Sequence, residues 1–268
     1  MSQLIRSYQN MKVADYLRKE KPATVVLIFW HGLGDLVMFM PCFNHLKSMF
    51  PDIEIDIALQ KGVGQEVLMG GALLIQNANQ AIDGYDYTFQ IHFPMSESLG
   101  GLWTKQEWCC IQELGIDPIS YYPKFIEYQS KLVALHFQAT ALPDPVNPDE
   151  ATAKKVWGEV IQAGFIPIEA LFKHIYFNPV NKKFDFITSH CRDVPATIGK
   201  LISLLQSCAA SICVASGNLP LSISIMPDRT LYLEKEFSIK SYTKENIATV
   251  DVKNYKEGSV KEWLMNIV

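Results

Sequence analysis

Hydrophobic and polar positions follow one another in the first part of the chain in a pattern typical of an α/β protein. Residues 24–30 are apolar throughout and rich in β-branched and aromatic side chains, which predicts a strand covered on both faces in a parallel sheet. A glycine turn follows at 32–34, and residues 36–50 predict a helix that ends before a proline. Residues 53–57 alternate isoleucine with acidic residues, which predicts a second strand. This β–turn–α–β unit is the opening of a doubly wound sheet.

Further elements are predicted from the same apolar periodicity and from the turn residues between periodic segments. Ahead of the first strand, residues 4–20 place their apolar side chains on one face, which predicts an amphipathic helix. Later segments predict βα units over 72–91, a helix over 105–114 closed by Gly115, a strand at 132–136, a helix at 150–163 ended by Gly164, a short strand at 184–188, a helix at 196–208 and a strand at 211–215. The sequence Ser259-x-x-Glu262 is a capping box that predicts a terminal helix.

These elements predict two domains rich in βα units, joined near residues 118–131. We place the domains at 1–125 and 126–268, each with a Rossmann-like parallel sheet, and expect the terminal helix to pack back on the first domain.

Composition and charge restrict the classes of function. Hydrophobic residues make up 49% of the chain and charged residues 19%, which suits a sizeable core. The net charge of −4 argues against strong binding to unmodified duplex DNA. The longest apolar run, residues 25–30, is far shorter than the 18 or so residues that span a bilayer, and the N-terminus has no signal-peptide pattern. Six cysteines without a C-x-x-C pair indicate reduced thiols and a cytoplasmic protein.

The turn Gly32-Leu33-Gly34-Asp35 carries the most informative polar residue. Two glycines allow a sharp turn and leave room for a ligand close to the main chain. A dinucleotide fingerprint, G-x-G-x-x-G, fails here because its third glycine is Val37, although an acid near the end of the second strand, Asp56, agrees with it. Asp35 itself has two readings: a favourable charge at a helix N-terminus, or a general base at the carboxyl edge of a parallel sheet.

The residues around this turn resemble a known family. The shared positions are Gly32-Leu33-Gly34-Asp35, Pro41, Leu46-Lys47 and Phe50-Pro51. Together they are similar to the N-terminal signature of the heptosyltransferase-like glycosyltransferases, glycosyltransferase family 9. Weaker similarities follow in order at Tyr85-Asp86, at residues 135–140 and at Ser216-Gly217, which resembles the donor motif of the family.

The resemblance implies a GT-B fold, in which two facing Rossmann-like domains enclose the active site in a cleft. It implies an inverting transfer without metal or other cofactor, in which Asp35 takes the proton of an acceptor hydroxyl that attacks C1 of an ADP-heptose-like or other nucleotide sugar. The acceptor is expected on the first domain near His31, Gly32 and Gly34; by analogy it is a lipopolysaccharide-core or related surface glycan, and a protein or a modified nucleic-acid base stays open. The donor is expected on the second domain, at His136, Gln138, Thr140, Ser216, Gly217 and Asn218.

The donor motif departs from the family pattern, because Ala215 replaces its aspartate and Pro220 its histidine. Residues 216–218 still offer hydroxyl, glycine and amide groups at a helix N-terminus, which suits a phosphate, but an ordinary turn with an N-cap serine has the same pattern. A satisfied core residue is the alternative for His136. Two other functions stay open: a GT-B-like scaffold that binds without transfer, and an NAD(P)-dependent oxidoreductase, which the missing third glycine disfavours.

Overall fold

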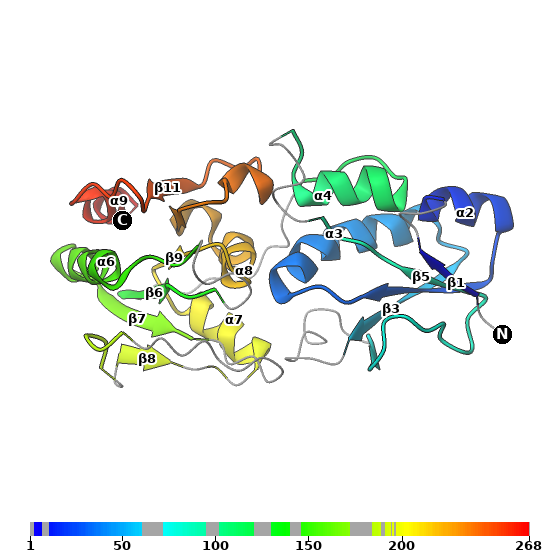
Figure 1. The fold of residues 1–268 in the computed structure, drawn as a ribbon, viewed down its shortest axis with the longest axis horizontal. Coiled ribbons are helices and arrows are strands. Elements are labelled where there is room, and N and C mark those ends of the chain that lie inside the picture. The colour runs from blue at the N-terminus through cyan, green and yellow to red at the C-terminus, as the bar shows by residue number, and fades with distance from the viewer. Residues whose placement is uncertain are drawn as a thin grey trace. The chain divides into compact units, whose positions relative to one another are not determined.

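The fold is taken from a computed structural model, which describes residues 3–6, 11–60, 72–94, 102–120, 130–139, 146–171, 184–188, 191–193, 195 and 197–267. The chain divides into two units. Unit 1 comprises Met1–Tyr122 with Lys240–Thr243, and unit 2 comprises Pro123–Ile239 with Lys244–Val268. Each unit is built on its own sheet of parallel strands (Figure 1). Within the described residues, no helix is both long and apolar enough to cross a membrane.

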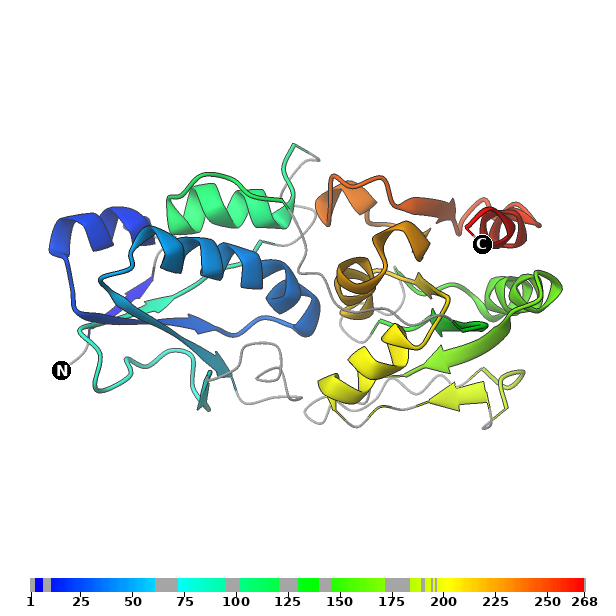
Figure 2. The ribbon, with the colours of Figure 1, turned by 180° about the vertical axis from the view of Figure 1, so that it is seen from behind.

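Unit 1 holds a five-stranded sheet in the order β1-β5-β2-β3-β4, with every neighbouring pair parallel. Its elements are β1 (Gln3–Arg6), α2 (Val13–Glu20), β2 (Thr24–Phe29), α3 (Leu33–Met49), β3 (Glu54–Gln60), β4 (Leu73–Ile75), β5 (Tyr87–Gln90), α4 (Lys105–Trp108) and a π-helical turn, η3 (Cys109–Leu114), that continues α4. Helices α2, α3 and α4 lie on one face of the sheet (Figure 2).

The central strand β2 is buried on both faces, as its unbroken apolar run predicted. On the helical face, Phe29 stacks on Phe39 of α3 with 4.6 Å between ring centroids. On the other face, Val26 and Ile28 pack with Ala58 and Ala78. Because all strands are parallel, β2 delivers the chain at the carboxyl edge of the sheet, directly before the glycine turn.

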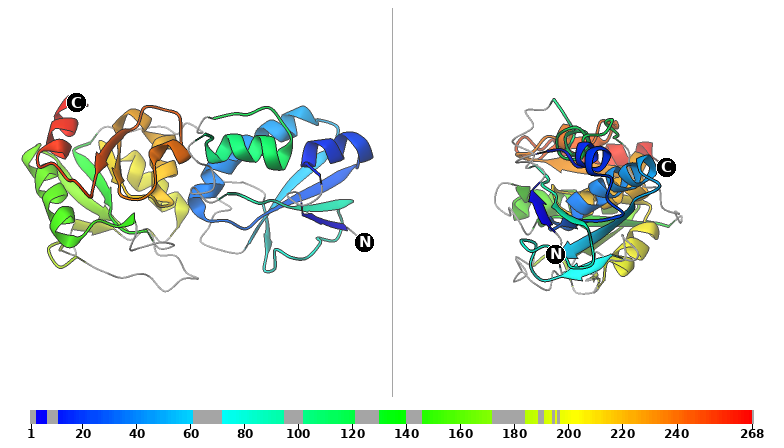
Figure 3. Two further views of the ribbon diagram at one scale, coloured as in Figure 1. Left: turned by 45° about the horizontal axis from the view of Figure 1, so that its top comes forward. Right: turned by 90° about the vertical axis from the view of Figure 1, so that its right-hand side faces the viewer.

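Unit 2 holds a six-stranded parallel sheet in the order β11-β10-β9-β6-β7-β8. Its elements are β6 (Leu132–His136), α6 (Glu150–Gln162), β7 (Ile166–Ala170), β8 (Arg192–Asp193), α7 (Ile198–Gln206), β9 (Ala210–Cys213), α8 (Asn218–Ile225), η5 (Pro227–Arg229), β10 (Thr230–Glu234), η6 (Ile239–Ser241, shared with unit 1), β11 (Ala248–Asp251) and α9 (Ser259–Asn266). Helices α6 and α9 lie at one end of this unit in the ribbon, and α7 and α8 lie together (Figure 3).

The apolar side of the terminal helix α9 packs within unit 2. Its side chains Val260 and Leu264 are fully buried in the same core as Val156 and Val160 of α6. The segment that does belong to unit 1 is Lys240–Thr243. An amphipathic helix covers whichever apolar face lies beside it, and its sequence alone does not say which domain supplies that face.

The terminal helix predicted from the sequence forms, as α9, but the predicted capping box at its start does not. Its N-cap is Gly258, which has φ 90° and no side-chain cap, and Glu262 is exposed. The buried carboxylate of Glu159, on α6, accepts hydrogen bonds from the backbone N–H of Gly258, Val260 and Lys261 at 2.8, 2.9 and 3.1 Å. A partner about a hundred residues away thus takes the place of the local cap.

Two other short elements differ from the prediction. Residues 3–6 form the edge strand β1, and the helix that was predicted over 4–20 begins at Val13. Residues 184–188 form a turn, and the strand lies at Arg192–Asp193 instead. Phe184 and Ile187 are buried in the core of unit 2, so their apolar pattern reflects a packed turn. The apolar pattern of a segment of only a few residues fits a helix, a strand or a packed turn equally well.

Candidate functional site

Asp35 lies in the first turn of α3, at the carboxyl edge of the unit 1 sheet. The N-cap of α3 is Gly32, which is exposed and has φ −67° and ψ 173°, a conformation open to any residue. A Cβ atom added to Gly32 would meet no atom within 4 Å. The backbone conformation at position 32 therefore does not require glycine, and Gly32 leaves an open surface three residues before Asp35.

A buried lysine holds Asp35. Nζ of Lys105, at the start of α4, lies 2.8 Å from Oδ1 of Asp35, and the two side chains are 8% and 23% exposed. Within the described residues, Oδ2 of Asp35 accepts no hydrogen bond. One carboxylate oxygen is therefore fixed by an ion pair while the other is free to accept a proton from a ligand.

His31 belongs to the structural support of this turn. Its Nε2 accepts a hydrogen bond from the backbone N–H of Phe93 at 3.0 Å, so the ring is neutral with its proton on Nδ1. Burial lowers the pKa of His31 to about 4, although the neighbouring Asp35 carboxylate acts in the opposite direction. The ring packs against Phe29 and Trp30 at centroid distances of 5.3 and 4.4 Å. These contacts favour the packing role for His31 over an acceptor contact.

Asp56, the acid that agreed with a dinucleotide site, is not at the end of its strand. It is the third residue of β3 and lies opposite Val26 in the middle of the sheet register. Its Oδ2 accepts a hydrogen bond from the hydroxyl of Tyr85 at 2.6 Å. Asp56 therefore has a structural partner and does not support the dinucleotide interpretation.

The turn after β9 carries the predicted donor residues of unit 2. The N-cap of α8 is Gly217, without a side-chain cap, and Oγ of Ser216 accepts from the backbone N–H of Asn218 at 3.3 Å. Asn218 is 2% exposed, and its Nδ2 has no hydrogen-bond partner among the described residues. A buried amide donor without a partner costs about 1–3 kcal/mol, so Asn218 is an unusual residue for the first turn of this helix.

The residues that replace the family's aspartate and histidine have ordinary structural positions. Ala215 packs against the unit 2 core. Pro220 is the third residue of α8, where a proline is compatible with the helix but removes one backbone donor. Its carbonyl oxygen accepts from Oγ of Ser224 at 2.9 Å.

The remaining donor candidates lie near the end of β6. His136 is 7% exposed, and its Nδ1 is 2.6 Å from the carbonyl oxygen of Ala170 on the neighbouring strand. Burial lowers the pKa of His136, so the ring is neutral and Nδ1 is the donor. This geometry favours the satisfied core histidine. Gln138 is buried at 6% exposure, and Thr140 lies outside the described residues.

Sequence reasoning missed Lys105, the partner of Asp35. The pair joins positions 70 residues apart, on helices α3 and α4. Lys105 is one of several lysines in polar surroundings in the sequence, and only the tertiary contact marks it. The one local signal was Thr104-x-x-Glu107, a capping box whose two hydrogen bonds, 3.2 and 2.9 Å, fix the start of α4.

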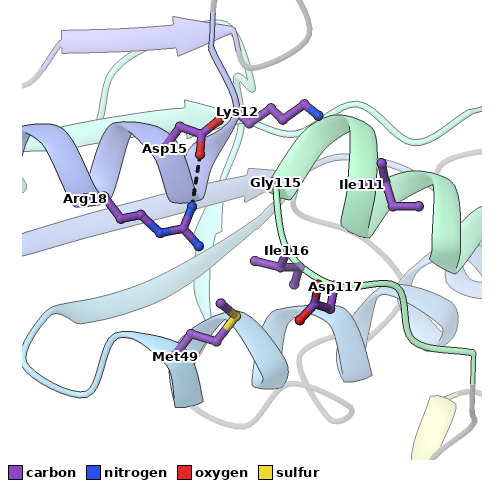
Figure 4. Close-up of a pocket in the computed structure, with 8 residues that line it drawn as sticks. All are labelled: Lys12, Asp15, Arg18, Met49, Ile111, Gly115, Ile116 and Asp117. Carbon is purple, nitrogen blue, oxygen red and sulfur yellow. Dashed lines mark hydrogen bonds and ion pairs between the residues drawn. The ribbon is translucent and has the colours of Figure 1, made fainter.

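A separate hollow of about 290 Å³ lies at the other end of α3 (Figure 4). It is lined by Lys12, Asp15, Arg18, Met49, Ile111, Gly115, Ile116 and Asp117. Arg18 is already paired with Asp15 at 2.9 Å. Met49 is the last residue of α3, so this hollow is about 20 Å along the helix from Asp35 at 1.5 Å per residue, and is distinct from the site at the glycine turn.

All six cysteines carry free thiols, and five are buried. In the part of the chain that the structure describes, no group of three or more histidine, cysteine, aspartate or glutamate residues is placed to hold a metal ion.

The two parallel sheets with their covering helices define the class of fold, which is GT-B-like. Solved structures that resemble the chain include glycosyltransferases. One is the E. coli heptosyltransferase WaaC with ADP, with a TM-score of 0.60 and 11% identity over 91% of this chain and 100% of that chain. Another is the glycosyl transferase family 9 protein from Veillonella parvula, with a TM-score of 0.55 and 14% identity over 91% of this chain and 96% of that chain.

A third is the iron-containing dodecameric glycosyltransferase TibC from enterotoxigenic E. coli, with a TM-score of 0.63 and 10% identity over 90% of this chain. The chain spans only 64% of the length of TibC. The sequence matches no protein-family model and no curated protein sequence. At these identities the likeness establishes the fold, and the chemistry has to be argued from the residues of this chain.

Proposed function

We propose that the protein is an inverting, metal-independent glycosyltransferase that moves a sugar from a nucleotide-activated donor to a hydroxyl group of a glycan or other acceptor. The observation that carries this proposal is the carboxylate of Asp35, held by Lys105 through Oδ1 and open at Oδ2. It lies beside the exposed Gly32, at the sheet edge where ligands of open α/β folds bind.

The proposed reaction is a single displacement. The acceptor hydroxyl loses its proton to Oδ2 of Asp35, and its oxygen forms a bond to C1 of the donor sugar. The bond from C1 to the phosphate oxygen breaks at the same time, and its electron pair leaves with the nucleoside diphosphate. A positioned general base of this kind contributes about 10²–10⁴ in rate.

The donor is proposed to bind unit 2 with its diphosphate at the N-terminus of α8. The unpaired backbone N–H groups at the start of α8 and the positive end of its helix dipole both favour an anion there. ADP is the ligand of the WaaC structure that the chain resembles, so ADP-sugars are the first donors to test. Unit 1 is then the acceptor-binding unit.

The test compares Asp35→Asn with Asp15→Asn in a transfer assay over a panel of ADP-, UDP- and GDP-sugars. Asp15 is a matched control because it is also the third residue of its helix and is also in an ion pair, with Arg18. We expect Asp35→Asn to lower donor turnover by about 10²–10⁴ with unchanged donor affinity, and Asp15→Asn to retain parental activity. Near-parental turnover by Asp35→Asn would show that Asp35 is not the base and acts only as a charge at the helix N-terminus. Binding of nucleotide sugars by the parental protein without any turnover would instead support the scaffold function.

The donor site has its own test, Asn218→Asp. The added negative charge should weaken binding of ADP by at least about tenfold in calorimetric titration, because the carboxylate repels the diphosphate. Asn218 is buried, so the new carboxylate should also lower stability, and thermal unfolding is measured alongside to show that the variant is folded at the temperature of the titration. Ser224→Ala serves as the control and should bind ADP normally, because Ser224 lies further along α8 and, within the described residues, its hydroxyl bonds to the Pro220 carbonyl alone. Unchanged affinity for ADP in Asn218→Asp would contradict the proposal that the diphosphate binds at the N-terminus of this helix.

A further inference from the structure

Lys105 is held with little freedom beside Asp35. The capping box of Thr104 and Glu107 fixes the first turn of α4. The side-chain amide of Gln106 donates to the carbonyl oxygen of Met38 on α3 at 2.9 Å, which ties α4 to the helix that carries Asp35. The Lys105 ammonium therefore approaches Asp35 from a backbone whose position relative to α3 is already set.

Two aromatic rings complete the surroundings of the ammonium. Nζ of Lys105 lies 5.9 Å from the ring centroid of Phe93 and 5.7 Å from that of Tyr242, both within cation–π range. Tyr242 belongs to Lys240–Thr243, the segment of the later chain that is part of unit 1. Among the described residues, the cation thus has one anionic partner, Asp35, and two neutral partners that favour a positive charge.

We infer that Lys105 is the positioning residue of the proposed base, a role that rests on the proposed function. The ammonium binds Oδ1 and so presents Oδ2 to the acceptor hydroxyl. It remains a cation while Asp35 takes the proton, because the proton goes to Oδ2. A buried charge whose partner is neutralised is costly, and the rings of Phe93 and Tyr242 stabilise the ammonium during that step.

This arrangement distinguishes Lys105 from a lysine that serves only stability. A buried ion pair needs no aromatic partners to be satisfied in the resting protein, and replacing one by apolar side chains is often neutral for stability. Rings over the cation are useful when the charge of the carboxylate changes. The inference therefore predicts an effect on turnover that is larger than the effect on folding.

The test is a double-mutant cycle of Lys105→Met and Asp35→Asn, with kcat, KM for the donor and thermal unfolding measured for each variant. We expect Lys105→Met to lower kcat roughly 10- to 100-fold with KM for the donor within about twofold, since a carboxylate out of position costs on that order. The double variant should be no slower than Asp35→Asn alone, because Lys105 acts through Asp35. In Lys105→Ala, ethylammonium should restore part of kcat and ethanol should not.

The outcomes separate the inference from the proposed function. If Asp35→Asn loses turnover while Lys105→Met keeps the parental kcat, the positioning role is wrong and the base stands. Multiplied losses in the double variant would also overturn it, since Lys105 would then act independently of Asp35. Absence of transfer by the parental protein overturns the proposed function and this role with it. A folding defect in Lys105→Met is recognised by a lowered unfolding midpoint. In that case rescue of Lys105→Ala by ethylammonium supports the positioning role, and absence of rescue contradicts it.

Discussion

The Glu159 carboxylate supplies the cap of α9 from another helix, and replacing it by glutamine should loosen that helix specifically. Oε1 accepts from Gly258 and Oε2 accepts from Val260 and Lys261. In Glu159→Gln one of these positions becomes an NH₂ group, which cannot accept. The most favourable orientation of the glutamine amide places its oxygen at the Oε2 position, which keeps two hydrogen bonds. Its NH₂ group then faces the backbone N–H of Gly258, another donor.

The magnitude follows from that geometry. One hydrogen bond to a charged acceptor is lost, worth about 1.5–3 kcal/mol, and a buried donor is left without a partner. Glu159 is only 3% exposed, so water cannot replace the bond easily. We expect α9 to lose about 2–4 kcal/mol of stability, which corresponds to roughly a 30- to 900-fold loss of hydrogen-exchange protection at 1.36 kcal/mol per decade.

Native-state hydrogen exchange of the α9 amides measures this loss directly. Glu262→Gln is the matched control, because Glu262 belongs to the sequence capping box but is exposed in the structure. It should cost no more than about 1 kcal/mol, the scale of one charge at a helix end. Equal losses in the two variants, or a larger loss in Glu262→Gln, would refute the assignment of the cap to Glu159.

Further variants test the packing and the ionisation of unit 1 and unit 2. Gly115→Ala should destabilise by more than about 1 kcal/mol in denaturant unfolding, because Gly115 has φ 69° and an added Cβ would lie 2.7 Å from Cβ of Lys12. Gly158→Ala should instead stabilise by about 0.5–1 kcal/mol, since Gly158 is inside α6 with open space beside it. Phe29→Ala should cost about 3–5 kcal/mol through loss of its buried ring. His31 should titrate near pH 4 by NMR, and the unfolding free energy should fall as pH falls from about 6.5 to 4, because the unfolded chain binds this proton first; His31→Gln should remove that slope.

Much of the fold could be predicted because the central parallel strands are buried on both faces. The run that became β2, the helix that became α3 and the strand at β6 follow from apolar length and turn residues alone. Predictions were wrong where a segment is too short to show periodicity, as in β1. They were also wrong where a residue distant in sequence caps a helix, as Glu159 caps α9. Neither kind of error is visible in a local window of sequence.

The candidate site was predictable in part for a related reason. Asp35 could be located because a sheet edge, a glycine turn and a helix start are all local features. Its partner Lys105 is set by the packing of α4 on α3, which depends on contacts such as that between Gln106 and Met38. The buried state of His136 likewise depends on Ala170 of a strand that the sequence pattern did not reveal.

The π-helical turn η3 has a consequence for insertions and deletions. Residues Cys109–Leu114 wind more widely than an α-helix and directly continue α4, which carries Lys105. Each residue of an α-helix turns the chain by about 100° and advances it about 1.5 Å. Removing one residue from η3 would restore regular α winding, and because a π turn holds one residue more than an α turn, Lys105 would keep nearly its direction toward Asp35. Removing a second residue would rotate Lys105 by about 100° away from Asp35, if the Gly115 end stays in place. The ion pair therefore depends on the length of this turn as well as on the identity of the two residues, and it should survive the loss of one residue there more readily than the loss of two.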